Sequence, residues 1–289
     1  MPPSAATEPE IDSVSQGVHY FLLDKHRTLY FTVWTVSVFA ALALSIPFVL
    51  SDPYFLSLTQ NDGTLFLVLF TLFIPPAAMY LVAQSRMRRE MMQQIALSLG
   101  FTYAASASAD SVSGELFSIG HSHKIFDVLS GAYRGFPVRV FTFQYTVGSG
   151  KSSHTYDKTV FELTYSAALP HILLVPVLSY LMTPSGLEAV ELEGDFGKRF
   201  ALYISRGAQM EAREVFQPDF MQEMIDTYAE CQFETLGTVL SIVTGSEITA
   251  RAQFMSMRSL ADSLIDNLLP GLQATAQNTV PEAPVAENV

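Results

Sequence analysis

The sequence predicts an α+β protein in which an N-terminal two-helix transmembrane hairpin precedes a cytoplasmic antiparallel β-sheet domain with C-terminal helices. Three observations support this fold class. Of the 289 residues, 49% are hydrophobic and only 15% are charged, whereas soluble domains average about 25% charged residues. Two long uncharged runs lie in the first third of the chain. After them, alternating patterns typical of strands come before helical patterns.

The two uncharged runs, residues 30–50 and 65–83, have the length of membrane spans. As a helix, the first run would extend about 31 Å, which matches a hydrocarbon core of about 30 Å. The link between the runs has no Lys or Arg, whereas Lys25, Arg27 and Arg86 flank the pair. The positive-inside rule therefore predicts a multi-pass inner-membrane protein with two spans and both termini in the cytoplasm. A buried helix pair of a soluble protein is the alternative.

Residues within the two runs favour an anchor over a transport machine. Ser37, Ala41 and Ser45 recur every four residues, a spacing that lets helix backbones pack closely. Pro75 and Pro76 predict a kink in the second run, because proline removes backbone hydrogen bonds. Neither run contains the ionisable residues that proton relays and ion sites usually need.

Helices are also expected on both sides of the hairpin. The leader, residues 1–29, is predicted to be disordered at its start and to contain an interfacial helix. The apolar stripe of that helix consists of Val18, Phe21, Leu22 and Leu29. After the second run, apolar residues repeat at four-residue spacing and end at Gly100, which predicts one helix over 64–99. The segments are the leader 1–29, the hairpin 30–84, a juxtamembrane helix 85–99, an α+β domain 100–270 and a disordered tail 271–289.

The α+β domain is predicted from strand patterns that precede helical ones. The residues between 149 and 153 are turn-like and join two of the expected strands into a hairpin. Two adjacent apolar residues, Val140 and Phe141, predict a β-bulge. Strands are expected at 125–129, 136–147, 158–165, 171–177, 188–191, 199–204 and 235–243, and helices at 209–216, 219–230 and 249–268, the second of these after Pro218.

Residues Gly148 to Ser152 look like the end of a phosphate-binding loop that includes Lys151. The full pattern requires an earlier glycine at the position of Tyr145. A phosphate loop also leads into a helix, whereas this segment leads into an expected strand. We therefore interpret it as a hairpin turn and expect no nucleotide.

Two histidines, His121 and His123, have a spacing that puts both side chains on one face of a strand. Asp127, His154 and Asp157 are candidates for a third metal ligand only by elimination. Structural or surface histidines are therefore the favoured interpretation.

The remaining candidates for chemistry are an acidic cluster and one thiol. Paired carboxylates can carry out acid–base chemistry, but a solvated strand edge or loop is the favoured interpretation of the cluster. The single cysteine, Cys231, excludes an internal disulfide and has no basic sequence neighbour, which favours a packed thiol. No catalytic, cofactor-binding or metal-binding residue is predicted. The acidic cluster consists of Glu188, Glu191, Glu193 and Asp195.

A set of glycine, aromatic and proline positions between residues 85 and 230 resembles an uncharacterised family of bacterial membrane-anchored proteins with a small cytoplasmic α+β domain. The resemblance implies that fold and brings no assigned activity, so it implies no catalytic residue. The positions, in chain order, are Gly100, Phe101, Tyr103, Leu116, Phe117, Gly120, Gly131, Tyr133, Gly135, Val138, Val140, Phe141, Phe143, Tyr145, Gly148, Gly150, Lys151, Thr159, Val160, Leu169, Pro170, Val215, Phe216 and Pro218.

The expected function is a non-enzymatic, membrane-anchored binding or scaffold module that contacts the lipid bilayer and a protein partner or itself. The formal net charge of −12 argues against nucleic acid as a partner. One alternative is a membrane-tethered enzyme whose site gathers His121, His123, Asp157 and the acidic cluster. Another is a subunit of an oligomeric channel or transporter, built on the small-residue seam and the proline kink.

Overall fold

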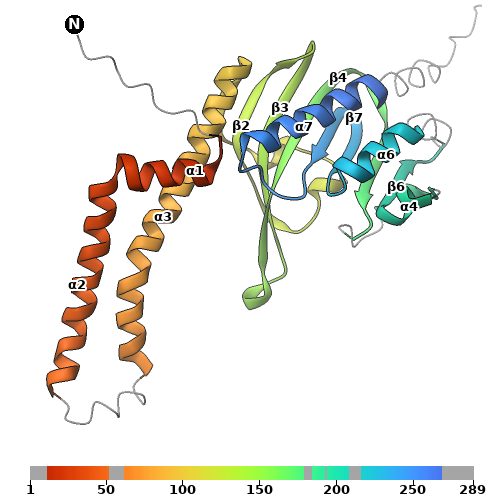
Figure 1. Cartoon of the computed structure of the whole chain (residues 1–289). Coiled ribbons are helices and arrows are strands. Elements are labelled where there is room, and N and C mark those ends of the chain that lie inside the picture. Colours follow the sequence, from red (N-terminus) through yellow and green to blue (C-terminus); the bar gives the residue numbers. More distant parts are fainter. Residues whose placement is uncertain (1–11, 52–61, 179–183, 193, 208–215, 269–289) are drawn as a thin grey trace, which may run out of the picture. The chain divides into compact units, whose positions relative to one another are not determined.

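The structure, a computed structural model, describes residues 12–51, 62–178, 184–192, 194–207 and 216–268 (Figure 1). The chain forms two compact units. The first comprises residues 1–94 together with 249–251, and the second comprises residues 95–248 and 252–289. We call the described part of the second unit the sheet domain.

The first unit is helical. It contains α1 (Val14–His19), the π-helical turn η1 (Tyr20–Lys25), α2 (Arg27–Ser51) and most of α3 (Asp62–Leu99). The Ser13 hydroxyl caps α1 by accepting a hydrogen bond from the backbone N–H of Gln16. Of the predicted apolar stripe, Val18, Phe21 and Leu22 are buried and Leu29 is exposed. The helix expected in the leader is therefore confirmed at residues 14–25.

The two apolar runs lie in α2 and α3, and the small-residue positions that are described pack closely. Ser37 and Ala41 are buried, as a packing seam requires, while the side chain of Ser45 lies outside the described residues. The predicted end of α3 is confirmed, because Gly100 follows the last helical residue with a φ of +70°. Residues 52–61, which link the runs, lie outside the described residues.

The predicted transmembrane hairpin is wrong. Among the residues that the structure describes, no helix combines the length and the apolar character that a membrane crossing requires. The two-span topology, the inner-membrane location and the cytoplasmic placement of both termini are corrected with it. The channel or transporter alternative depended on the same spans.

The sheet domain contains one seven-stranded sheet in which all strand pairs are antiparallel. The strand order is β1-β2-β3-β4-β6-β5, and β7 pairs with β4. The antiparallel α+β class of the domain is thus confirmed. The strands are β1 (Thr102–Ala107), β2 (His121–Tyr133), β3 (Phe136–Val147), β4 (His154–Pro176), β5 (Leu187–Val190), β6 (Phe200–Ser205) and β7 (Gln232–Val243).

Both faces of the central strands are buried, which corrects the predicted bulge. Val140 and Phe141 are adjacent and both buried, yet β3 pairs with β4 in unbroken register from Val138 to Val147. The register shifts instead at two places in β2, and one of them lies between Phe126 and Leu129, where Asp127 has a φ of +53°. Val140 and Phe141 are adjacent and apolar because both faces of β3 are buried, and the backbone of β3 is regular at this point.

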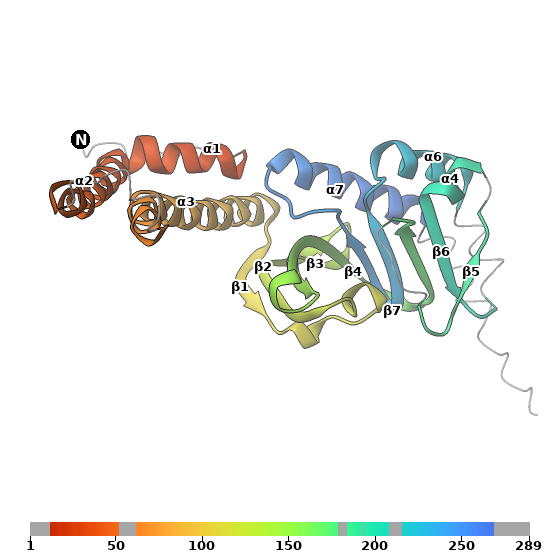
Figure 2. The same ribbon diagram turned by 90° about the horizontal axis from the view of Figure 1, so that it is seen from below.

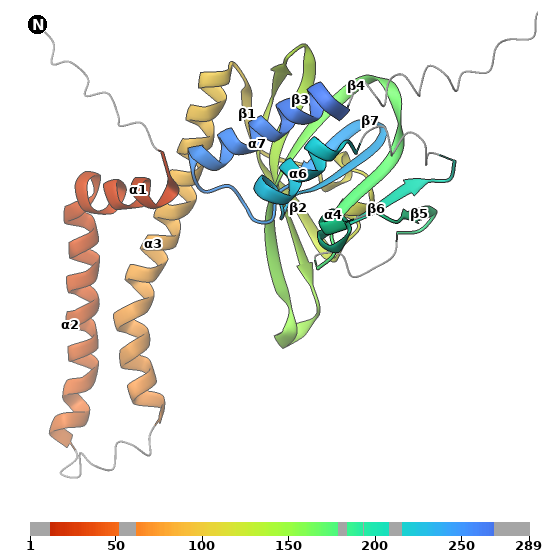
Figure 3. The ribbon, with the colours of Figure 1, turned by 45° about the vertical axis from the view of Figure 1, so that its right-hand side comes forward.

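The two faces have different partners. One face carries a core of Phe141, Phe143 and Val160, which the short 3-10 helix η4 (Glu115–Phe117) completes with Leu116 and Phe117. The opposite face is covered by α7 (Arg251–Ser263) and α6 (Pro218–Thr227), and Figures 2 and 3 show both helices on the same side of the curved sheet.

Several expected elements differ in their extent. The expected strands 158–165 and 171–177 are parts of the single long strand β4. The expected helix 249–268 consists of α7 and the π-helical turn η6 (Leu264–Leu268). The strand β1 and the short helix α4 (Gly194–Arg199) were not predicted. Most of the expected helix 209–216 and all of the expected tail 271–289 lie outside the described residues.

Candidate ligand pocket

A buried ion pair between neighbouring strands forms the centre of the candidate site. The residue register places Arg139 on β3 directly opposite Glu162 on β4. The guanidinium Nε and Nη2 atoms of Arg139 donate to Oε2 of Glu162 at 2.9 and 2.5 Å. Nη1 and Nη2 also donate to the hydroxyl and carbonyl oxygens of Ser111 at 3.0 and 3.1 Å. The guanidinium therefore ties two strands to the segment between β1 and β2.

Glu162 is the more buried partner of this pair. Its side chain is 8% exposed, against 25% for Arg139. Burial raises the pKa of the Glu162 carboxyl, and the charge and hydrogen bonds of Arg139 oppose that rise. Both hydrogen bonds from Arg139 end on Oε2, and Oε1 accepts none from the residues that the structure describes. Glu162 thus has one carboxylate oxygen with unused capacity as an acceptor.

This open oxygen borders a cavity of about 410 Å³. Glu162 and Arg139 line the cavity, and Oε1 is not among the described buried polar atoms that lack a partner, so this oxygen is accessible. Ser113, Ser130 and Thr164 also line the cavity, and their hydroxyls form no hydrogen bond with the described residues. A volume of this size lies within the range of small-ligand pockets, about 300–1,000 Å³.

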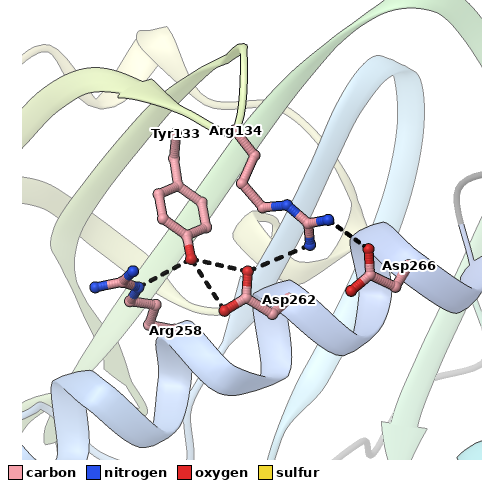
Figure 4. Close-up of polar contacts among 5 residues, drawn as sticks. All are labelled: Tyr133, Arg134, Arg258, Asp262 and Asp266. Atoms are coloured by element: carbon pink, nitrogen blue, oxygen red, sulfur yellow. Dashed lines mark hydrogen bonds and ion pairs between the residues drawn. The ribbon is translucent and has the colours of Figure 1, made fainter.

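A polar network anchors the hairpin that forms one wall of this cavity (Figure 4). The wall includes Gly131 and Pro137, on either side of the β2–β3 turn. The Tyr133 hydroxyl donates to the Asp262 carboxylate of α7 at 2.8 Å and accepts from Arg258 Nε at 2.9 Å. In the turn itself, Arg134 pairs with Asp262 and Asp266. These contacts fix the turn against α7 and so restrict the movement of the wall.

The two histidines considered as metal ligands each contact a backbone carbonyl in the structure. His121 and His123 each lie 2.9 Å, through Nε2, from a backbone carbonyl: that of Gly148 and that of Ile119, respectively. A register shift between His121 and Lys124 interrupts the alternation that would put both side chains on one face. Among the described residues no group of three potential metal ligands is present. Other members of the set have their own partners: Asp127 accepts from Tyr103, and Asp157 from Gln144.

The acidic cluster and the glycine-rich turn do not contribute to the cavity. Glu188 pairs with Arg206 and Asp195 pairs with Lys198, while Glu191 is exposed. Glu193 lies outside the described residues. Lys151 lies in the 3-10 turn η5 (Gly150–Ser152) that joins β3 to β4, which confirms the predicted hairpin turn.

Cys231 borders a second cavity, of about 320 Å³, together with Glu230 and Glu247. Burial is the main cause that raises the pKa of the Cys231 thiol to about 12, and the charge of Glu230 adds to it. The thiol is therefore protonated at neutral pH and is a weak nucleophile.

The ion pair of Arg139 and Glu162 was not predicted, and the sequence contains only part of the information needed to predict it. Counted outward from the expected turn 149–153, Arg139 faces Leu163 and Glu162 lies one residue away, so the expected hairpin brings the two charges near each other but does not give their register. The alternation of the expected strand 158–165 places Glu162 on the face that also carries Lys158 and Thr164. No local pattern signals the contribution of Ser111, which comes from a segment 28 residues away from Arg139.

Comparisons with known proteins give no family for this chain. No family model matches it, and no curated protein matches it. It is similar to one solved structure, the crystal structure of the mycobacterial trehalose monomycolate transport factor A, TtfA. That match has 16% sequence identity and a TM-score of 0.42, and it covers 68% of this chain and 96% of that chain. A score this low supports no statement about the function of this chain.

Proposed function

We propose that the sheet domain is a binding module that holds a segment of a partner protein in the Arg139–Glu162 cavity. The observation that carries this proposal is the unpartnered, accessible Oε1 of Glu162, which belongs to a side chain only 8% exposed that lines the cavity with Ser113, Ser130 and Thr164. Polar groups in such a position gain hydrogen bonds from a ligand at little cost in reorganisation. A partner protein was also the expectation from the sequence.

An extended protein segment suits the surroundings of the cavity better than a compact small molecule. Val239 of β7 lines the cavity, and the neighbouring residues Gly237 and Thr238 are exposed. Among the described strands, β7 pairs only with β4, so its second edge has no strand partner there. An extended segment can pair with such an edge and place one side chain in the adjacent pocket.

The test is selection of peptides from a random library displayed on phage, with the full chain immobilised. We expect enriched peptides that bind the wild-type chain and bind Thr164→Arg at least about tenfold more weakly by calorimetry. Thr164 is an exposed cavity residue, so this variant fills the cavity without removing a core contact. Ser166→Arg is the matched control, because Ser166 is exposed on the same strand and does not line the cavity. Peptides that bind both variants equally, or no enrichment, would refute the proposal.

An enzyme is the second candidate, and one observation favours it. Burial raises the pKa of the Glu162 carboxyl, and a carboxyl with a raised pKa that lines a cavity is a candidate general acid. Incubation of an enriched peptide with the chain, followed by mass spectrometry, separates the two functions. A binding module returns the peptide unchanged. A product that forms with the wild type and not with Glu162→Gln would support the enzyme.

A further inference from the structure

The charge balance of the cavity restricts the chemistry of its occupant. Arg139 and Glu162 form a pair with no net charge, and the guanidinium is held by four hydrogen bonds to Glu162 and Ser111. The occupant therefore meets a neutral site whose unused groups are Oε1 of Glu162 and the hydroxyls of Ser113, Ser130 and Thr164.

The open oxygen requires a hydrogen-bond donor. A carboxylate oxygen only accepts, and a buried acceptor gains most from a donor that replaces water. The hydroxyls both donate and accept. A ligand group that both donates to Oε1 and accepts from a hydroxyl can therefore form hydrogen bonds with Glu162 and with the Ser and Thr residues of the cavity.

Charged occupants fit this site poorly. An ammonium or guanidinium group at Oε1 would share its carboxylate with Arg139 and would lie close to a second positive charge. A carboxylate would face the charge of Glu162 and would give Oε1 no donor. A carboxamide avoids both conflicts, because its NH₂ donates, its carbonyl accepts, and it carries no charge.

We propose that the cavity selects a carboxamide side chain, Asn or Gln, of the bound segment, with Oε1 of Glu162 as the specificity-determining atom. This inference rests on the proposed function for the identity of the ligand. It can nevertheless be tested without a peptide, because the cavity would recognise the free functional group.

The experiment titrates the full ¹⁵N-labelled chain with three small probes of the same size: propionamide, propionate and propylammonium. The signals to follow are the Arg139 Nε–H and the backbone N–H of Gly131, both in the cavity wall. We expect propionamide to shift both signals saturably, and the two charged probes to bind at least about tenfold more weakly. Equal or tighter binding of propylammonium would overturn the proposal.

Two variants locate the effect. Glu162→Gln keeps an oxygen for Arg139 and presents an NH₂ to the cavity, so we expect propionamide binding to weaken by at least about tenfold. Thr164→Arg should abolish it, while the control Ser166→Arg should leave it unchanged. If propionamide shifted the signals of Glu162→Gln in the same way as those of the wild type, the proposed role of Oε1 would be overturned.

The outcomes separate this inference from the proposed function. If propionamide binds and no peptide is enriched on phage, the carboxamide specificity is supported and the protein-segment function fails. If enriched peptides bind in the cavity but lack Asn and Gln, the protein-segment function is supported and the carboxamide specificity fails.

Discussion

Two buried glutamates of the same sheet differ in how completely their carboxylates are used. Glu234, on β7, is 2% exposed, and Glu162, on β4, is 6% exposed. Both oxygens of Glu234 have partners within the chain, whereas only Oε2 of Glu162 does. Burial alone therefore does not distinguish a structural carboxylate from one available to a ligand; the number of unused acceptor sites does.

The saturated carboxylate joins the η4 segment to the sheet. Oε1 of Glu234 accepts from the backbone N–H of Glu115 at 2.9 Å, and Oε2 accepts from that of Leu116 at 3.0 Å. His171 on β4 adds a third contact, 2.7 Å from Oε1. These bonds satisfy the free N–H groups at the start of η4, whose Leu116 and Phe117 complete the core.

The strongest test of the comparison replaces each glutamate by glutamine. Glu234→Gln must turn an NH₂ toward a donor that the carboxylate accepted, so we expect a loss of about 3 kcal/mol in the free energy of unfolding. Glu162→Gln can keep its oxygen on Arg139 and turn its NH₂ to the cavity, so we expect a change within about 1 kcal/mol. Urea unfolding measures both.

The exposed Glu191 supplies the control for this pair. Glu191→Gln should change the free energy of unfolding by no more than about 0.5 kcal/mol. If Glu162→Gln were as destabilising as Glu234→Gln, the cavity carboxylate would be a structural group like its counterpart, and the comparison would fail.

Gly114→Ala tests how tightly the Glu234 carboxylate is enclosed. Gly114 has a φ of +129°, and an added Cβ would lie 2.5 Å from Oε2 of Glu234. Gly135, in the β2–β3 turn, has a φ of +88° but open space around it. We expect a loss of about 2 kcal/mol for Gly114→Ala against about 1 kcal/mol for Gly135→Ala. Equal losses would show that backbone strain alone acts and that the carboxylate can move away.

The sequence predicts well the strands and turns whose patterns are local. It predicts poorly the features that depend on contacts between distant segments. The bounds of β3 agree with the expected run 136–147, because its alternating apolar residues and following turn are local signals. The strand β1 was missed because Thr102–Ala107 contains mainly Ala and Ser, which have weak strand preference. Its place is set by pairing with β2 and not by its own pattern.

The same distinction explains what was missed in the candidate site. The expected hairpin brings Arg139 only to within one residue of the position opposite Glu162, and the contact with Ser111 comes from a distant segment. Glu234 reaches Glu115 across 119 residues, and no periodicity connects them. The spacing of His121 and His123 predicts that both side chains lie on one strand face. A register shift in β2 between His121 and Lys124 interrupts the regular alternation that this prediction requires.

His171→Ala removes one of the three partners of Glu234 and leaves both backbone contacts. His171 is 21% exposed in its side chain, so water can partly replace it at the carboxylate. We expect a loss of about 1 kcal/mol in thermal unfolding. His154→Ala, at an exposed position of the same strand, is the control and should have no measurable effect. If His171→Ala lost as much stability as Glu234→Gln, the main role of the Glu234 carboxylate would be to hold His171.

The smallest expected effect is a difference in pH dependence between the wild type and Glu162→Gln. Burial raises the pKa of Glu162 in the folded chain above its value in the unfolded chain, against the opposing effect of Arg139. The folded state therefore binds a proton more readily, and this contribution to stability is present at low pH and is lost as the pH rises through the folded pKa. As the pH rises above about 4.3, the ordinary pKa of a Glu carboxyl, the stability of the wild type relative to Glu162→Gln should fall. A relative stability that rises with pH would mean that the bond to Arg139 outweighs desolvation, and Oε1 would then be less available to a ligand than the cavity geometry indicates.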